Sequence, residues 1–247
     1  MVDDHDRKQV EFYERTAGRY DRSVWSLGCR DNRNHEAKIR AIAAAIGAGG
    51  GGRVLEVGAG TGLHARWLLQ HSPIEHTGVD LSRPMLAIAA QRLAEFRDRS
   101  RLAIADALDL PFGDATFDAA FCAGTLHHLP SAGAGLRELA RVVKPGGRVA
   151  ALEPNWKFPS VLVYSAITPE ERKTFRINER RLAEWARAAG LERVEVRRLL
   201  YTPPKPARLG AAYDRIDARL VRIPVVRALS INLLVTGRRL GPPDSGS

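Results

Sequence analysis

The most informative residues form a glycine-rich turn directly after a short apolar run. Glu56 precedes the turn, and Gly58, Gly60 and Gly62 follow at alternate positions. Glycines at a strand-to-helix turn let the backbone bend sharply and approach a bound molecule closely. The spacing differs from the G-x-G-x-x-G pattern of dinucleotide sites, because Leu63 stands where the third glycine would be. Glu56 would also repel a pyrophosphate, so the turn favours a ligand that carries positive charge.

Two further carboxylates stand where predicted strands end. Asp80 closes the segment Gly78-Val-Asp, and Asp106 follows the next short apolar run. A carboxylate in the position of Asp80 can accept hydrogen bonds from both hydroxyls of an adenosine ribose. Asp106 could accept from an adenine amino group, or it could be a turn or helix-capping residue. The ribose contact alone does not separate the candidate ligands, because nicotinamide dinucleotides also contain a ribose.

These residues must be placed by elements that alternate between strands and helices. Short apolar runs predict strands, and apolar residues at helical spacing predict helices. The predicted strands are 53–57, 75–80, 102–105, 117–122, 148–153, 192–199 and 230–237. The predicted helices are 9–25, 34–46, 63–70, 82–99, 136–143 and 179–189, and residues 144–147 form a turn. This alternation indicates an α/β fold with a mostly parallel sheet, helices on both faces, and ligands at the carboxyl ends of the strands.

Five motifs in this order resemble one known family. They are VLEVGAGTG (54–62), GVDLS (78–82), ADALDLPF (105–112), FDAAFCAGTLHHL (117–129) and LARVVKPGGRVAALEPN (139–155). Together they resemble the class I S-adenosylmethionine-dependent methyltransferases of the small-molecule and quinone or lipid type. The resemblance spans about residues 9–200 and continues in the last strand. It implies a Rossmann-like three-layer sandwich with a mostly parallel seven-stranded sheet and an antiparallel last strand, which pairs 192–199 with 230–237.

The resemblance also assigns a cofactor, S-adenosylmethionine, with S-adenosylhomocysteine as product. Its methionine portion is expected on the glycine-rich turn, its ribose beside the second strand and its adenine beside the third. The residues implied in cofactor binding are Tyr20, Glu56, Gly58, Ala59, Gly60, Gly62, Asp80, Leu81, Asp106, Ala107 and Cys122. Tyr13 and Tyr20 lie in the segment 12–21, which resembles the family's N-terminal cover, and Tyr13 is expected to contact substrate.

Methyl transfer needs alignment of the acceptor with an activated methyl group, and it needs a base only when the acceptor must lose a proton. His127 and His128 follow the fourth strand, and an imidazole suits proton removal from a hydroxyl or an acidic carbon. The alternative is that the pair only packs or caps the next segment. Glu153, at the end of the fifth strand, could contact substrate or could be a solvated strand-end carboxylate.

Metal and cysteine chemistry are not indicated. The seven histidines and two cysteines show no metal-ligand spacing, so no metal is expected. Cys122 lies in an apolar strand, where a small buried side chain is favoured over a nucleophile. Two distant cysteines predict reduced thiols, and the polar, acidic start is not a signal peptide; both favour a cytoplasmic location.

The net charge of +10 lies mostly in residues 151–247. Such surface attracts nucleic acid, anionic lipid or an acidic small molecule, although a general preference for arginine is an alternative explanation. Residues 1–46 are expected to cover the site, and 201–229 to form a helical insertion in one domain spanning 1–247. An apolar stripe with flanking arginines in 201–229 indicates a lid, a protomer contact, a peripheral membrane contact or a helix packed on the sheet edge.

The sequence therefore favours an enzyme that methylates oxygen, carbon or nitrogen of a small molecule, possibly anionic or amphipathic. The alternatives are an RNA methyltransferase, a nicotinamide-dependent oxidoreductase and a non-catalytic basic binding protein on the same fold. Nucleic acid is disfavoured as a partner, because no basic groove interleaved with aromatic residues is visible. The sequence predicts neither the acceptor nor the oligomeric state.

Overall fold

The computed structural model describes residue 11 and residues 32–200 and 230–241. Apart from residue 11, the predicted helix 9–25, with Tyr13 and Tyr20, lies outside the described residues, and so does the segment 201–229. No helix in the described part of the chain is long and apolar enough to cross a membrane.

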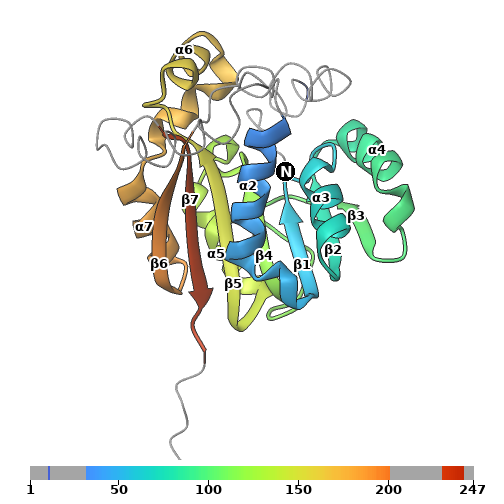
Figure 1. The fold of residues 1–247 in the computed structure, drawn as a ribbon. Helices are drawn as coiled ribbons and strands as arrows, with labels where there is room; N and C mark the ends of the chain where they lie inside the picture. Colours follow the sequence, from blue (N-terminus) through green and yellow to red (C-terminus); the bar gives the residue numbers. More distant parts are fainter. Residues whose placement is uncertain (1–10, 12–31, 201–229, 242–247) are drawn as a thin grey trace, which may run out of the picture.

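A seven-stranded sheet forms the centre of the molecule (Figure 1). Its strands are β1 (Gly52–Val57), β2 (Ile74–Asp80), β3 (Ser100–Ile104), β4 (Phe117–Ala123), β5 (Val143–Pro154), β6 (Leu191–Leu200) and β7 (Ser230–Arg239). They lie in the order β3-β2-β1-β4-β5-β7-β6. The first five strands pair in parallel, whereas β7 is antiparallel to both β5 and β6. The predicted Rossmann-like sheet with its antiparallel last strand is confirmed.

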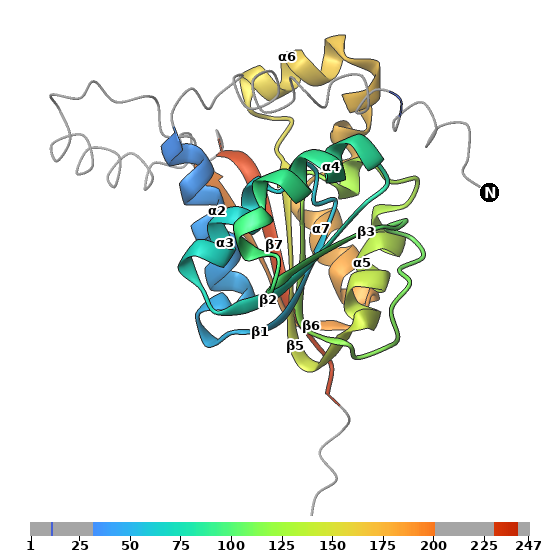
Figure 2. The same cartoon turned by 90° about the vertical axis from the view of Figure 1, so that its right-hand side faces the viewer.

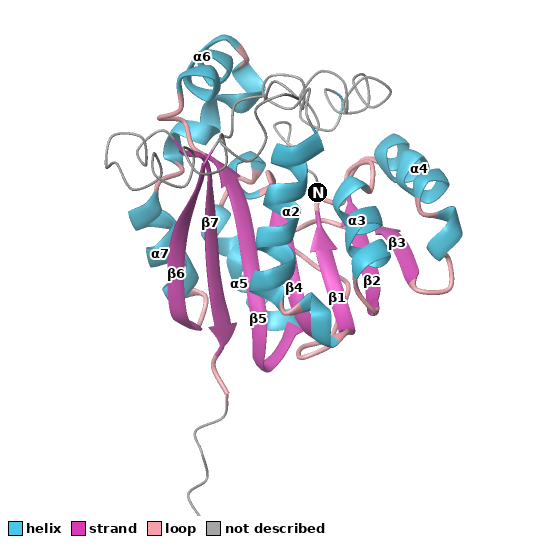
Figure 3. Ribbon diagram, viewed as in Figure 1, coloured by secondary structure: helices cyan, strands magenta, loops and turns pink. Residues whose placement is uncertain are grey.

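Helices cover both faces of this sheet, which gives three layers (Figures 2 and 3). The helices are α2 (Asn32–Ile46), α3 (Leu63–His71), α4 (Arg83–Arg92), α5 (Ala132–Val142), α6 (Pro159–Ile167) and α7 (Glu179–Ala188). Short 3-10 segments are η1 (Ala48–Gly50), η2 (Ala94–Phe96), η3 (Leu126–His128) and η4 (Pro169–Arg176). Apolar residues of α2 and α3 pack with Val54 and Phe121, while those of α5 and α7 pack with Leu55 and Val57. Alternate strand residues face opposite layers, as the pleat of a strand requires.

Three predicted boundaries are wrong. The helix predicted over 82–99 ends at Arg92, because the chain tightens into η2 and returns towards β3. Helix α5 begins at Ala132, earlier than predicted, because the Ser131 hydroxyl accepts a hydrogen bond from the Ala134 amide. Residues 144–147 belong to β5 and do not form a separate turn. The pairing of β5 with β4 shifts register in this region. The remaining predicted strands and the helices at α2, α3 and α7 are present within about two residues.

The carboxyl ends of the parallel strands meet at one end of the sheet. Helix α6 stands beyond this end in Figure 1, and η4 follows it in the chain. Neither was predicted as a separate element. Helix α6 and η4 expose four large apolar side chains: Leu162, Val163, Ile167 and Phe175.

Candidate functional site

The glycine-rich turn has the backbone geometry that only glycine adopts without strain. Gly58, Gly60 and Gly62 have φ angles of 73°, 52° and 76°. The amides of Gly58 and Ala59 both donate to the carbonyl of Val79, at 2.8 and 2.9 Å, which fastens the turn to β2. A β-carbon added at Gly60 would meet no atom within 4 Å. The backbone at Gly60 is therefore open to a bound molecule.

Asp80 holds this turn in place from the end of β2. Its Oδ2 accepts a hydrogen bond from the Gly60 amide at 2.8 Å, and its Oδ1 accepts one from the Ser82 amide at 2.9 Å. Burial raises the pKa of the Asp80 carboxyl, and the two amide donors oppose that rise. Each carboxylate oxygen has a second lone pair for a ligand hydroxyl. Leu81 lies between Asp80 and Ser82 in the chain, and it is partly exposed.

Glu56 lies beneath the turn, with no exposed surface. Its Oε1 is 3.3 Å from His64 Nδ1, and its Oε2 is 3.1 Å from His76 Nε2. Burial would raise the pKa of Glu56, but hydrogen bonds from the two histidines leave it lowered. The ring of His64 also stacks on that of His35, with ring centroids 5.2 Å apart. The sequence did not predict these histidine partners. They favour the charged form of the Glu56 carboxylate inside the protein.

Asp106 forms a turn after β3. Its Oδ1 accepts from the Leu108 amide at 2.8 Å, and its carbonyl accepts from the Asp109 amide at 3.2 Å. The turn role that the sequence left open is therefore confirmed, and the adenine contact of Asp106 and Ala107 stays a prediction. Both side chains are partly exposed, so a ligand can reach them.

Cys122 lies inside β4 with no exposed surface. Burial raises the pKa of its thiol well above the ordinary value, and the carboxylates of Glu153 and Glu56 add to this rise. The predicted small buried role of Cys122 is confirmed. Any contact with a cofactor would have to involve its backbone.

Glu153, at the end of β5, organises the segment that follows β4. Its Oε1 accepts from the amides of Thr125 and Leu126 at 3.1 and 2.9 Å, and its Oε2 accepts from the His127 amide at 3.2 Å. The side chain is fully buried. Glu153 thus satisfies three backbone donors at the start of η3, and it is not a solvated strand-end carboxylate.

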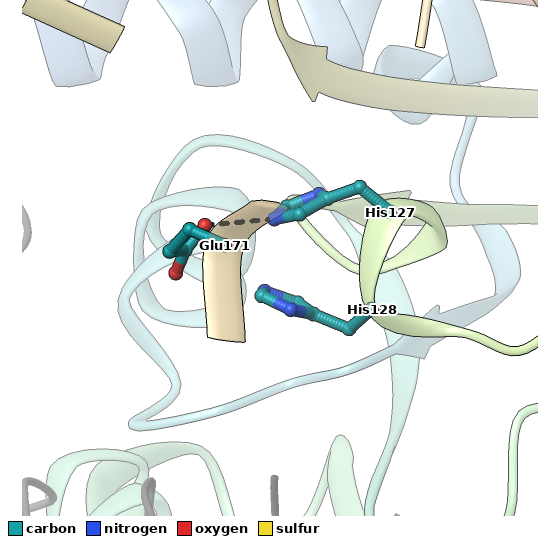
Figure 4. A group of neighbouring side chains, drawn as sticks. All are labelled: His127, His128 and Glu171. Atoms are coloured by element: carbon teal, nitrogen blue, oxygen red, sulfur yellow. Dashed lines mark hydrogen bonds and ion pairs between the residues drawn. The ribbon is translucent and has the colours of Figure 1, made fainter. Parts of the chain in front are cut away.

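His127 lies between the carboxylates of Glu153 and Glu171, and Figure 4 shows its contact with Glu171. Its Nδ1 is 2.6 Å from Glu153 Oε2, and its Nε2 is 3.2 Å from Glu171 Oε2. Burial would lower the pKa of His127, but the charges and hydrogen bonds of Glu153 and Glu171 raise it to about 10. Burial likewise would raise the pKa of Glu171, but the hydrogen bond from His127 and the nearby charges of His128 and His127 lower it to about 2. An imidazolium that donates both protons to carboxylates has no lone pair with which to act as a base.

His128 is partly exposed, and its ring lies 3.8 Å from the His127 ring between centroids. The side chains of His127, His128 and Glu171 each offer one metal-ligand atom, and these atoms lie within 4.8 Å of one another. The sequence did not predict this group, because Glu171 is 44 positions from His127. In the structure, His127 Nε2 and Glu171 Oε2 are hydrogen-bonded to each other.

The fold and the site define one class of protein. A parallel α/β sheet with an antiparallel last strand carries an open glycine turn after its first strand and an aspartate after its second. This combination fits a nucleoside ligand that lacks a pyrophosphate at the turn. It is the Rossmann-like arrangement of methyltransferases.

Comparisons with known proteins agree. Residues 55–151 match a family model described as a methyltransferase domain. The chain is 32% identical over 232 residues to a demethylmenaquinone methyltransferase of Clavibacter sepedonicus, covering 81% of this chain and 91% of that protein. It is 37% identical over 102 residues to the methyltransferase GfsG of Streptomyces halstedii, covering 40% of this chain and only 37% of that protein. A methyltransferase structure from Thermotoga maritima shares the fold, with a TM-score of 0.65, 21% identity, and coverage of 93% of this chain and 99% of that one.

The chain belongs to the class I S-adenosylmethionine-dependent methyltransferases. Its cofactor is S-adenosylmethionine, and the chain is an enzyme of the group that methylates small molecules. The nicotinamide alternative is thereby excluded.

Proposed function

We propose that the chain methylates a small acceptor that combines an apolar body with an anionic or ionisable group. The observation that carries this proposal is the composition of the segment beyond the carboxyl ends of the strands. There, α6 and η4 expose four apolar side chains, with Ile167 at 72% exposure, while the lining of a cavity beside η4 includes three cationic side chains among apolar ones. The relative from Clavibacter sepedonicus is named as a demethylmenaquinone methyltransferase, which supports a small-molecule acceptor here.

The cavity has a volume of about 170 Å³ and lies between η3, α5, η4 and α7. Lys173, Arg176 and Arg181 line it, together with Trp185 and no carboxylate. Within the described part of the chain, no carboxylate lies at ion-pair distance from Arg176 or Arg181. A space of this size would take one polar group, such as a carboxylate or an ionised hydroxyl, and the rest of the acceptor would lie along the apolar residues.

S-adenosylmethionine supplies an activated methyl group. The glycine turn would bind its methionine portion, Asp80 with Leu81 its ribose, and Asp106 with Ala107 its adenine. His128 in its neutral form would accept the proton of the acceptor, because it is partly exposed and His127 is held as a cation. Tyr13 and Tyr20 would close over the cofactor, and Glu153 would act on substrate only through the η3 backbone that it holds.

Label transfer tests this proposal. The purified chain is incubated with methyl-labelled S-adenosylmethionine and an extract that lacks the enzyme, and label is followed into lipid, aqueous and nucleic-acid fractions. We expect label in the lipid or aqueous fraction and none with Asp80→Ala. Label only in nucleic acid would contradict the proposal.

Charge reversal tests the cationic cavity. Arg176→Glu and Arg181→Glu should raise KM for the acceptor by about tenfold or more, since a favourable contact becomes a repulsion. Arg187→Glu, on the same helix as Arg181 but outside the cavity, is the matched control. An equal effect of all three variants would show that only the overall charge matters.

We also propose a cytoplasmic location, supported by the buried thiol of Cys122. The proposed membrane contact of 201–229 and the single-domain organisation over 1–247 stay predictions, because the first segment lies wholly, and the second range partly, outside the described residues.

A further inference from the structure

A buried ionic chain joins three separate segments next to the cofactor turn. Glu153 at the end of β5 contacts His127 in η3, and His127 contacts Glu171 in η4, at 2.6 and 3.2 Å. The side chain of Glu153 has no exposed surface, His127 is 4% exposed and Glu171 is 9% exposed. Groups buried so far from water remain charged only when they are paired with an opposite charge. The charged form of each member therefore depends on the others.

The chain lies beside the glycine turn. Thr125, which precedes η3, donates its hydroxyl to the Val57 carbonyl at the end of β1, and its Oγ1 lies 2.2 Å from where a β-carbon of Gly58 would be. Glu153 fixes this segment through the amides of Thr125 and Leu126. Glu171 therefore connects η4, through one histidine, to the backbone that supports the cofactor turn.

Other charged and titratable groups face Glu171 from the elements packed against it. From η3, His128 faces Glu171; from α6, Tyr164 is close enough for Glu171 to raise the pKa of its phenol, after the effect of burial. From η4, Lys173 donates to the carbonyl of His128 at 3.2 Å, which makes a second connection between η3 and η4. Two buried carboxylates without the imidazolium between them would repel each other.

We propose that Glu171 is a positioning residue, which acts through His127 to hold η4 over the carboxyl ends of β4 and β5. Segment η4 carries Lys173 and Arg176 of the cationic cavity and Phe175 of the exposed apolar group. Its placement thus decides where an acceptor meets the cofactor turn. This role rests on the proposed function, because that function assigns acceptor binding to η4.

Hydrogen exchange of the full chain tests the positioning without any substrate. In Glu171→Gln and Glu171→Ala, we expect the amides of 169–176 to exchange at least tenfold faster than in the wild type, while those of 54–62 are unchanged. Glu171→Asp, which keeps the charge, should restore part of the protection. Glu170→Gln is the matched control, since Glu170 neighbours Glu171 and makes no contact with His127 in the structure.

Kinetics with the acceptor found by label transfer then test the consequence. We expect Glu171→Gln to raise KM for the acceptor about tenfold, with the Kd for S-adenosylmethionine changed less than about twofold. If label transfer fails, the proposed function fails, but the exchange measurement still decides the role of Glu171.

Two results would overturn the inference. One is unchanged exchange of 169–176 in both Glu171→Gln and Glu171→Ala. The other is a stoichiometric metal ion in the purified wild type that is lost in Glu171→Gln and His128→Gln. The cluster would then be a metal site, and no imidazolium would hold η4.

Discussion

The replacement Gly58→Ala should destabilise the chain strongly, for two separate reasons. Gly58 has a φ of 73°, and an alanine held in this region costs about 1–2 kcal/mol. The added β-carbon would also lie 2.2 Å from Thr125 Oγ1 and 3.0 Å from its Cγ2. Forcing a methyl group into a filled space costs typically about 1–3 kcal/mol. We therefore expect a loss of about 2–5 kcal/mol in the free energy of unfolding, measured by urea titration with circular dichroism.

Gly60→Ala is the matched control in the same turn. Gly60 has a φ of 52°, but its β-carbon would meet nothing within 4 Å, so only the backbone cost of about 1–2 kcal/mol applies. Because this open side is where the cofactor is expected, Gly60→Ala should instead weaken S-adenosylmethionine binding by tenfold or more in calorimetry. The two variants thus separate packing of the turn from access to it.

A double variant identifies the clash. Thr125→Ala removes both close atoms, at the expense of the hydroxyl hydrogen bond to Val57. In the Thr125→Ala background, Gly58→Ala should therefore cost about 1–2 kcal/mol less than in the wild type. If Gly58→Ala is no more destabilising than Gly60→Ala, or if Thr125→Ala gives no relief, the reasoning is refuted.

Three further predictions concern single contacts. Asp80→Asn should weaken S-adenosylmethionine binding at least tenfold in calorimetry, because an amide cannot accept from both backbone donors and the ribose; unchanged affinity would exclude Asp80 from the site. The stability advantage of the wild type over Glu171→Gln should be largest near pH 5–6. His127 contributes fully to the free energy of unfolding below its unfolded pKa of about 6.5, and this contribution is lost as the pH rises through its folded pKa of about 10. Glu171 contributes fully above its unfolded pKa of about 4.5, and this contribution is lost as the pH falls towards its folded pKa of about 2. If the ion pair does not form, urea titrations would give a difference in the free energy of unfolding between wild type and Glu171→Gln that does not change with pH. Asn155→Ala should cost about 1–3 kcal/mol, since its buried Nδ2 donates to the Ser230 carbonyl at 2.7 Å, and a thermal unfolding midpoint within 1 °C of the wild type would contradict this.

The sequence alone determined the order of the elements and the position of the glycine turn beside Asp80. Apolar runs and helical spacing predict the strands and most helices, because each pattern reflects which face of a local element is buried. The glycines of the turn and Asp80 follow from the same local logic. Positive φ angles require glycine at 58, 60 and 62, and a carboxylate at the end of β2 can reach the neighbouring turn.

Only the tertiary structure decided what the buried charged residues contact. His127 looked like a candidate base from its place after β4, but Glu153 and Glu171, 26 and 44 positions away, hold it as a cation. Glu56 was predicted to contact the cofactor, and this stays a prediction; in the structure its Oε2 contacts His76 and its Oε1 lies 3.3 Å from His64. No local pattern marks such partners, because a buried charge is paired by whichever side chain the packing of distant elements brings beside it. The strands were therefore predictable from periodicity, whereas the charge state of the site depends on long-range packing.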